Sequence, residues 1–299
     1  MERVSSAGNL SVFNAPGRWF RGNLHTHSTN SDGLLSPEEV LRFYKDRGYD
    51  FLAISDHRVT TEIANQDSSG LLVIPAIELD CYDPERQVGY HVVGLGVSPF
   101  NQDEDSRRGP AQRLIDTVRA AGGIAVLAHP YWSGQETGDL LVVEGAFGVE
   151  VFNATCRRHG KERGEMHWDN LLHRGHRLWG IACDDAHHYD LDGAQGWVMV
   201  RAAELTPSAI LDALQKGMFY ATRGPAILDI GMDGESIWVH CSPVQEIRFI
   251  GSRGTGRSVR ATGGEDLTFG RVKLPKSSYV RVECIDKVGR SAWSQPIFL

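Results

Sequence analysis

Short, nearly continuous runs of apolar residues recur along the chain before Gly224, and many of them end in polar residues. The runs are rich in Val, Ile and Leu, with little alternation between apolar and polar positions. Such runs are typical of strands that are buried on both faces, as in a parallel sheet. They lie at residues 20–27, 51–57, 71–78, 91–97, 124–129, 149–153 and 178–185.

Segments with helical periodicity lie between these runs. The sequence Ser36-Pro37-Glu38-Glu39 has the pattern of a capping box with proline at the first helical position, so it predicts a helix start. Alternating strands and helices predict an α/β domain, and seven such strands favour a closed or nearly closed barrel. Further helices are predicted at residues 111–121, about 161–172 and 206–216.

After Gly224-Pro225 the pattern changes. The helical periodicity ends, glycines become frequent, and short alternating runs follow at residues 237–240, 247–250, 267–272 and 279–285. This pattern predicts a small all-β, sandwich-like domain. We therefore expect an α/β barrel domain over residues 1–224 and a β domain over residues 225–299.

Composition and charge argue against several classes of protein. The chain is 41% hydrophobic and 23% charged, as in ordinary globular proteins. Its formal net charge of −7 argues against non-specific binding to nucleic acid or anionic membranes, which requires a basic field. No secretory signal and no membrane-spanning apolar run is evident. Five scattered cysteines without a CxxC pair indicate reduced thiols, so we expect a cytoplasmic protein.

The candidate chemistry lies at the predicted strand ends. Six of the 12 histidines stand at or just after such an end, together with three carboxylates. In a β/α barrel these ends converge on one face, where active sites lie. His25 and His27 are two residues apart, so both imidazoles project from the same side of one strand. The nine candidate metal ligands are His25, His27, Asp32, His57, Glu78, His91, His129, Asp185 and His187.

This set of ligands indicates a multinuclear site. Imidazole and carboxylate without thiolate suit zinc, manganese or iron. Nine ligands are too many for one ion with an open position, so two or three divalent ions that share a carboxylate are expected. Such ions activate water and leave the site positively charged, which favours an anionic substrate. The alternative is a set of separate histidines, each hydrogen-bonded for structural reasons.

Six segments resemble, in order, the motifs of the PHP (polymerase and histidinol phosphatase) metallohydrolases. They are GNLHTHSTNSDG (22–33), AISDH (53–57), AIELD (76–80), YHVVGLG (90–96), LAHP (127–130) and CDDAH (183–187). The resemblance covers about residues 18–224 and implies a distorted (β/α)7 barrel with a trinuclear site.

The same resemblance implies how the ligands are shared. One ion would be held by His25, His27, Glu78 and Asp185, and a second by Glu78, His91 and His129. Asp32, His57 and His187 would hold the third. The residues expected to act in catalysis are Glu78, Asp185 and His187.

The chain also resembles a carbaryl-hydrolase-like subgroup that carries a C-terminal β module. The segments FYATRGPA (219–226) and AWSQPIFL (292–299) carry this likeness. Most of the superfamily cleaves phosphoesters, whereas the namesake of this subgroup cleaves a carbamate ester. The bond that is cleaved therefore remains open between these classes.

A group of basic residues is the candidate substrate clamp. Arg157, Arg158 and Lys161 follow the strand that ends at Asn153, and Arg223 follows a predicted turn. Guanidinium groups match phosphate oxygens bidentately, although a solvated basic loop is the alternative. Glu150, inward on its strand, could pair with one of these arginines or line the pocket, and a structural ion pair is the alternative.

Three functional hypotheses follow. The first is a metal-dependent phosphoesterase that uses a metal-bridged hydroxide to hydrolyse a small phosphorylated metabolite. The second is a hydrolase of carboxyl esters, amides or carbamates at the same site. The third is a non-catalytic metal-binding interaction module. We expect a small anionic substrate and no membrane or nucleic-acid partner, and a homo-oligomer remains open.

Overall fold

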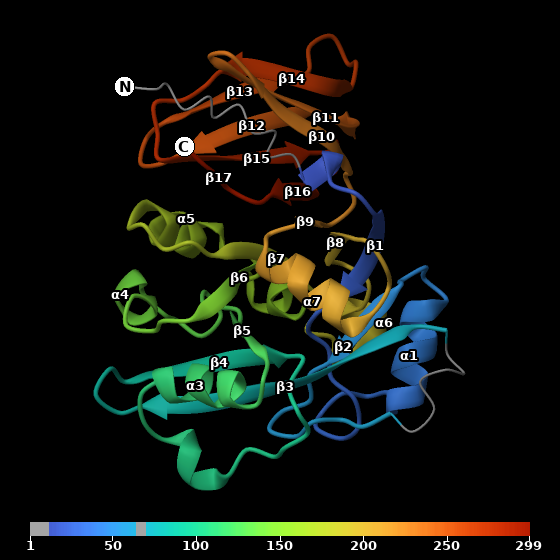
Figure 1. The fold of residues 1–299 in the computed structure, drawn as a ribbon, viewed down its shortest axis with the longest axis vertical. Coiled ribbons are helices and arrows are strands. Elements are labelled where there is room, and N and C mark those ends of the chain that lie inside the picture. The colour runs from blue at the N-terminus through green and yellow to red at the C-terminus, as the bar shows by residue number, and fades with distance from the viewer. Residues whose placement is uncertain (1–11, 64–69) are drawn as a thin grey trace.

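The computed structural model describes residues 12–63 and 70–299. It is a mixed α/β structure with a large 14-stranded sheet, a separate 3-stranded sheet and a few short helices (Figure 1). The predicted α/β class is confirmed. No helix in the described ranges is both long and apolar enough to cross a bilayer.

The first part of the chain alternates strands and helices, as predicted. Three short 3-10 helices occur at Val12–Asn14, Glu104–Arg107 and Thr155–His159. The strands are β1 (Arg18–Asn23), β2 (Phe51–Ile54), β3 (Leu72–Asp83), β4 (Val88–Leu95), β5 (Ile124–Leu127), β6 (Ala146–Asn153), β7 (Trp179–Cys183), β8 (Trp197–Ala202) and β9 (Phe219–Thr222). The helices are α1 (Pro37–Lys45), α3 (Gln112–Ala120), α4 (Thr137–Leu140), α5 (Glu165–His173), α6 (Tyr189–Asp192) and α7 (Pro207–Gln215).

Helix α1 shows how the sequence sets a helix boundary. The Ser36 hydroxyl accepts a hydrogen bond from the Glu39 backbone N–H, and the Glu39 side chain accepts one from the Ser36 backbone N–H. This capping box satisfies donors that the first helical turn leaves free. Val40 and Tyr44 on the inner face are buried in an apolar cluster that also contains Leu52 of β2.

The large sheet is not uniformly parallel, which differs from the expectation. β1, β2 and β3 are parallel, and so are β5, β6 and β7, but β4 runs antiparallel to both β3 and β5. The physical reason is the short connection of residues 84–87, because a tight turn joins antiparallel strands while a parallel pair needs a long crossover. β3 also extends well beyond Glu78, where the apolar run ends.

The described strands do not form a closed hydrogen-bonded ring. The path through the large sheet ends at β7, and one isolated bridge between Thr26 and Ala186 joins the segments that follow β1 and β7. On its other side, the path continues from β9 into the C-terminal strands. A (β/α)7 barrel therefore remains a prediction.

All the secondary-structure elements described after Gly224 are strands, and they occupy the top of Figure 1. β10, β11 and β14 form the small sheet, whereas β12, β13, β15, β16 and β17 extend the large one through the pairing of β16 with β9. Their shared core includes Val239, Phe249 and Val282. The bounds are β10 (Ile227–Asp233), β11 (Ser236–Val244), β12 (Glu246–Gly251), β13 (Gly256–Arg260), β14 (Leu267–Lys273), β15 (Tyr279–Ile285), β16 (Ser291–Ser294) and β17 (Ile297–Phe298).

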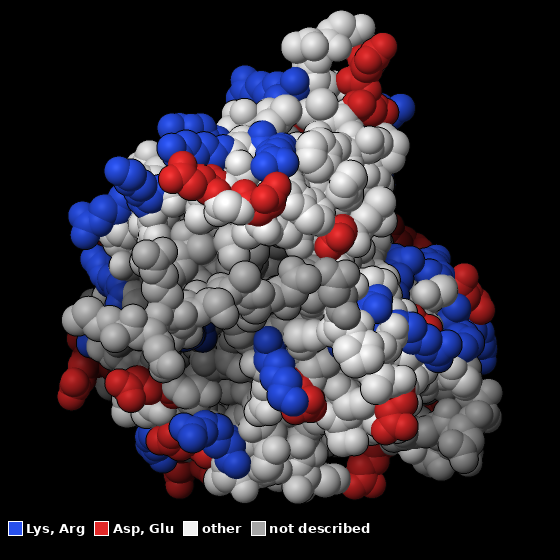
Figure 2. Space-filling model, turned by 45° about the horizontal axis from the view of Figure 1, so that its top comes forward, with Lys and Arg blue, Asp and Glu red and all other residues white. Residues whose placement is uncertain are grey.

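The predicted boundary near residue 224 falls between β9 and β10. Because β16 pairs with β9, the sheet is continuous across this point, and the separation into two domains remains a prediction. Figure 2 shows a face on which Lys and Arg side chains are mixed with Asp and Glu. All five cysteines are buried and unbridged.

Candidate metal centre

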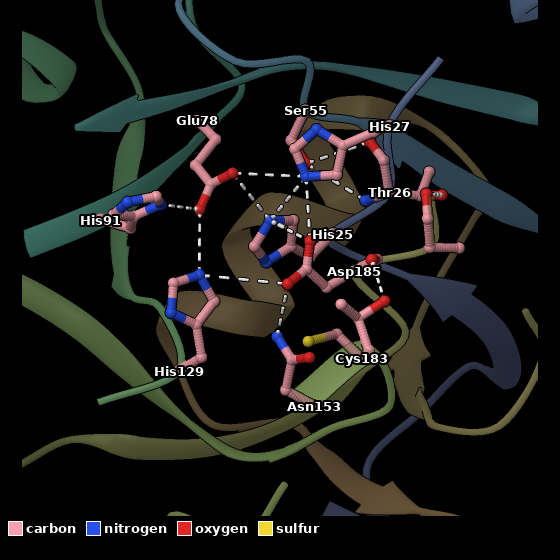
Figure 3. A network of polar contacts seen from close by, with 12 residues as sticks. His25, Thr26, His27, Ser55, Glu78, His91, His129, Asn153, Cys183 and Asp185 are labelled. Carbon is pink, nitrogen blue, oxygen red and sulfur yellow. Dashed lines mark hydrogen bonds and ion pairs between the residues drawn. The ribbon is translucent and has the colours of Figure 1, made fainter. Parts of the chain in front are cut away.

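The nine predicted ligands lie together near the Glu78 side chain, which is buried in the middle of β3. Figure 3 labels His25, His27, Glu78, His91, His129 and Asp185 of this set. His57, His129 and Asp185 follow the ends of β2, β5 and β7. Glu78 and His91 differ from the expectation, because both lie inside strands. Antiparallel pairing brings them together: Asp80 is opposite His91, so Glu78 is its diagonal neighbour on the same face.

The His25-Thr26-His27 segment directs two imidazoles into the centre. Its extended backbone continues from β1, and Thr26 bridges to Ala186. The Thr26 hydroxyl lies 3.0 Å from the Tyr189 hydroxyl, on the side away from the two rings. The Nε2 atoms of His25 and His27 are 3.2 Å apart, and both side chains are buried. The alternation within this segment therefore produces the arrangement that the sequence predicts.

We call His25, His27, Glu78 and Asp185 the inner cluster. One ligand atom from each lies within 4.8 Å of the others, and all four residues are buried. Glu78 Oε2 is 3.3 Å from Nε2 of both histidines. Asp185 Oδ1 is 3.2 Å from Nε2 of His25 and 2.9 Å from Nε2 of His27. Neither of these carboxylate oxygens has a partner with hydrogen-bond geometry among the described residues, so only the nearby imidazoles offset the cost of burying their charge.

The other oxygen of Glu78 faces two more histidines. Oε1 lies 2.8 Å from Nδ1 of His91 and 3.1 Å from Nε2 of His129, as Figure 3 shows. Glu78 therefore contacts imidazoles with both carboxylate oxygens, the geometry required of a carboxylate shared between two ions.

We call His27, Asp32, His57 and His187 the outer cluster, and its ligand atoms also lie within 4.8 Å of one another. Asp32 Oδ1 is 3.3 Å from Nε2 of His187, and Oδ2 is 3.5 Å from Nε2 of His57. The Asp32 side chain is 54% exposed, and the His57 and His187 side chains are each 17% exposed. This cluster forms the solvent side of the centre.

The electrostatics link the imidazoles to the carboxylates. Burial opposes ionisation of Glu78, but His25, His57 and His91 outweigh it and hold the pKa of Glu78 well below its usual range. Burial also lowers the pKa of His187, while its hydrogen bond with Asp32 and the charge of Asp185 raise that pKa to about 9. In the metal-free protein, the positive charge of protonated imidazoles therefore offsets the negative charge of the neighbouring carboxylates.

Two more buried carboxylates lie near the cluster. Asp184 faces away from it, and Glu150 lies beneath it. Asp184 accepts hydrogen bonds from the Tyr44 hydroxyl and from the backbone N–H groups of residues 194–196, and burial raises its pKa to about 7. It therefore does not compete with Asp185 for the cluster. Glu150 contacts His25 and the His129 backbone, so among the described contacts it forms a buried ion pair with a histidine and not with a clamp arginine.

A pocket of about 380 Å³ opens over the cluster. Arg158 is the one predicted clamp residue that lines it, and its guanidinium lies 3.4 Å from Asp192. The other three have different contacts: Arg157 donates to Gln195, Lys161 lies over the Tyr131 ring, and Arg223 lies over the Phe152 ring. Burial and repulsion by Arg157 lower the pKa of Arg223 to about 10.

Some residues at this pocket are not among the predicted site residues. His159 and Thr155 line it, and both follow β6, so the strand-end argument applied to them as well. Asn153, the last residue of β6, donates a hydrogen bond to Asp185 Oδ2 at 3.0 Å. Trp132 also lines the pocket and packs edge-on against His129.

Comparison with known proteins gives a shared fold and partial sequence matches. No family model matches. A two-domain protein from Bacteroides vulgatus, containing a predicted PHP-like metal-dependent phosphoesterase, aligns over 95% of both chains with a TM-score of 0.51 at 14% identity. This likeness shows the fold.

Two curated relatives match parts of the sequence. Phosphoribosyl 1,2-cyclic phosphate 1,2-diphosphodiesterase of Eggerthella lenta is 38% identical over 79 residues, which is 25% of this chain and 30% of that protein. The 5'-3' exoribonuclease Rnm of Salmonella typhimurium is 32% identical over 106 residues, 31% of this chain and 36% of that protein. The chain thus spans about a third of the length of these relatives. The carbaryl-hydrolase-like subgroup remains a prediction.

Proposed function

We propose that this chain is a PHP-type metal-dependent phosphoesterase that hydrolyses a small phosphorylated substrate. One observation carries the proposal. Glu78 Oε2 and Asp185 Oδ1 are buried without a hydrogen-bond partner among the described residues, and imidazole nitrogens surround them. Divalent cations satisfy such oxygens and nitrogens together, so the residues present fit bound divalent ions.

Three ligand sets follow from the distances. The inner cluster would hold one ion. Glu78 would hold a second with His91 and His129, which both face its Oε1, and His57 also has a ligand atom close to Glu78 and His91. Asp32, His57 and His187 of the outer cluster would hold a third. Glu78 is then the shared carboxylate, and zinc, manganese and iron all suit these ligands.

The protein's own groups would bind and orient the substrate. Bound divalent ions would acidify water and neutralise charge on a phosphoryl group. Arg158, His159 and His188 line the pocket above the cluster and supply donors for phosphate oxygens or for a leaving group. The buried inner cluster limits access of bulk water from below, and Trp132 lines the pocket beside His129. A volume of about 380 Å³ suits a small molecule.

The names of the relatives favour phosphoester chemistry over carbamate cleavage. One is a cyclic phosphate diesterase and the other an exoribonuclease, so each acts on a phosphodiester. The two alternatives are hydrolysis of carboxyl esters, amides or carbamates, and a non-catalytic metal module. The following test distinguishes them from a phosphoesterase.

The test compares three chromogenic substrates: p-nitrophenyl phosphate, bis-p-nitrophenyl phosphate and p-nitrophenyl acetate. We expect metal-dependent turnover of a phosphate ester, inhibition by inorganic phosphate, and loss of activity in Glu78→Gln. Glu235→Gln is the matched control, because Glu235 is exposed and paired with Lys273. Turnover of the acetate ester alone, indifferent to phosphate, would support the carboxyl ester alternative. No metal-dependent turnover of any of the three would remove the support for an esterase.

A further inference from the structure

Glu150 of β6 lies beneath the candidate metal centre, and it is not among the nine predicted ligands. Its side chain is buried, and neither of its oxygens contacts an arginine among the described contacts. We propose that Glu150 is a positioning residue whose carboxylate fixes three ligands, His25, His129 and Asp185, in the orientation that binds metal. The inference rests on the metal centre proposed above.

The first contact fixes the His25 ring. Glu150 Oε1 lies 2.6 Å from His25 Nδ1, and an ionised carboxylate can only accept, so Nδ1 carries the proton. The lone pair of His25 is then on Nε2, the atom that faces Glu78 Oε2 and Asp185 Oδ1. A carboxylate behind a ligating histidine sets its tautomer and ring orientation and increases its basicity.

The second contact fixes the backbone of His129. Glu150 Oε2 accepts a hydrogen bond from the His129 N–H at 2.8 Å. His129 has a φ of 27°, a positive value that residues with a Cβ rarely adopt. The hydrogen bond stabilises this conformation just after β5, and it places the His129 ring with Nε2 3.1 Å from Glu78 Oε1.

The third contact reaches Asp185 through an amide. The side-chain nitrogen of Asn153 donates to Glu150 Oε2 at 2.9 Å and to Asp185 Oδ2 at 3.0 Å. Asp185 also has a positive φ, 53°, so a second strained ligand position is tied to the same carboxylate. Asn153 turns Oδ2 of Asp185 toward itself and leaves Oδ1 facing the two histidines (Figure 3).

Glu150 could instead be a ligand, because Glu150, His25 and Cys183 also have ligand atoms within 4.8 Å of one another. The contacts oppose this role. Both oxygens of Glu150 already accept hydrogen bonds, and the His25 nitrogen that faces Glu150 is the protonated one. The Cys183 thiol donates to the Phe152 carbonyl at 3.6 Å. A site of this kind would require a thiolate, whose absorption in a cobalt complex is diagnostic.

The experiment measures Co²⁺ binding to the full-length metal-free protein by competition with a chelator, without substrate. Glu150→Gln keeps the shape of the side chain, but one of its two ends becomes a donor and must lose either His25 or the donors to Oε2. We expect binding to weaken 10- to 100-fold, in line with other changes behind metal ligands, and the visible spectrum of the bound Co²⁺ to change. Glu150→Asp restores part of the affinity.

Glu283→Gln is the matched control, because Glu283 is also buried but pairs with Arg163 and Ser291 away from the cluster. It should bind Co²⁺ as the wild type does. If Glu150→Gln does not fold, Asn153→Ala removes one link only and should weaken binding by a smaller factor.

Three results would overturn the inference. In the first, a folded Glu150→Gln protein has wild-type affinity and spectrum. In the second, a thiolate-to-cobalt band in the wild type is lost in Cys183→Ser, which would make Glu150 a ligand. In the third, the wild type binds no Co²⁺, and the proposed metal centre fails as well. If the wild type binds Co²⁺ and Glu150→Gln binds it equally well, the inference about Glu150 is rejected, whereas the proposed function is not.

Discussion

The inner and outer clusters use the same residue types in different surroundings. The inner cluster is buried on or beside strands, and Glu150 and Asn153 hold its members from behind. The outer cluster includes Asp32, which lies on a loop and is 54% exposed, and two histidines that reach the pocket. Burial makes unpaired charge costly, so the inner cluster depends on cations more strongly than the outer one. The difference suggests a fixed inner site and a more exchangeable outer site.

The largest effect is expected at Glu78, the carboxylate that the first and second proposed ligand sets share. Glu78→Gln removes the negative charge that faces five imidazoles within 3.3 Å. We expect the loss of at least one ion and a fall of kcat/KM by about 1000-fold or more, the scale of removing a principal electrostatic stabiliser. Metal content and steady-state kinetics measure both. A variant with normal metal content would show that Glu78 is not a ligand.

Asp32 tests the outer cluster by itself. Asp32→Asn should release the outer ion and leave the inner ions bound, because Asp32 is not part of the inner cluster. We expect activity to fall by about 10- to 100-fold, as for other weakened metal sites. Isothermal titration with Zn²⁺ should show one site fewer than the wild type. Loss of every site would mean that the two clusters are not separable.

The metal-free protein should show a pH dependence to which the outer cluster contributes. Asp32 and Asp185 raise the pKa of His187 from 6.5 to about 9, so these contacts stabilise the fold fully below pH 6.5 and are lost as the pH rises through 9. The free energy of unfolding should fall by up to about 3 kcal/mol over this window. Urea denaturation at pH 6, 7.5 and 9 measures it, and His187→Gln should remove the part of the dependence that comes from His187, while His25, His57 and His129, whose pKa values are also raised, keep the rest. A rise in stability over the same window would contradict the assignment.

The smallest effect separates two neighbouring arginines. Arg158 lines the pocket, whereas Arg157 donates to Gln195. Arg158→Ala should raise KM for a phosphate ester by a few-fold to about 10-fold, the scale of one charge-assisted hydrogen bond, while Arg157→Ala changes it little. Equal effects of the two substitutions would remove the basis for choosing Arg158.

The sequence predicted the convergence of the nine side chains better than it predicted the sheet. The strand ends and the His25-Thr26-His27 alternation were sufficient for most of the cluster, because local periodicity decides which way each side chain points. The apolar runs could not reveal that β4 is antiparallel, since a strand buried on both faces reads alike in either direction. The sequence could not choose among the possible roles of Glu150, because its partners, His25 and the His129 backbone, are distant in sequence.

The central claim is that the clustered side chains hold more than one ion, and elemental analysis of protein purified with its native metals tests it most directly. We predict two to three equivalents of zinc, manganese or iron per chain in the wild type, and about one fewer in Asp32→Asn. Less than one equivalent in the wild type, after supplementation with all three metals, would contradict the account.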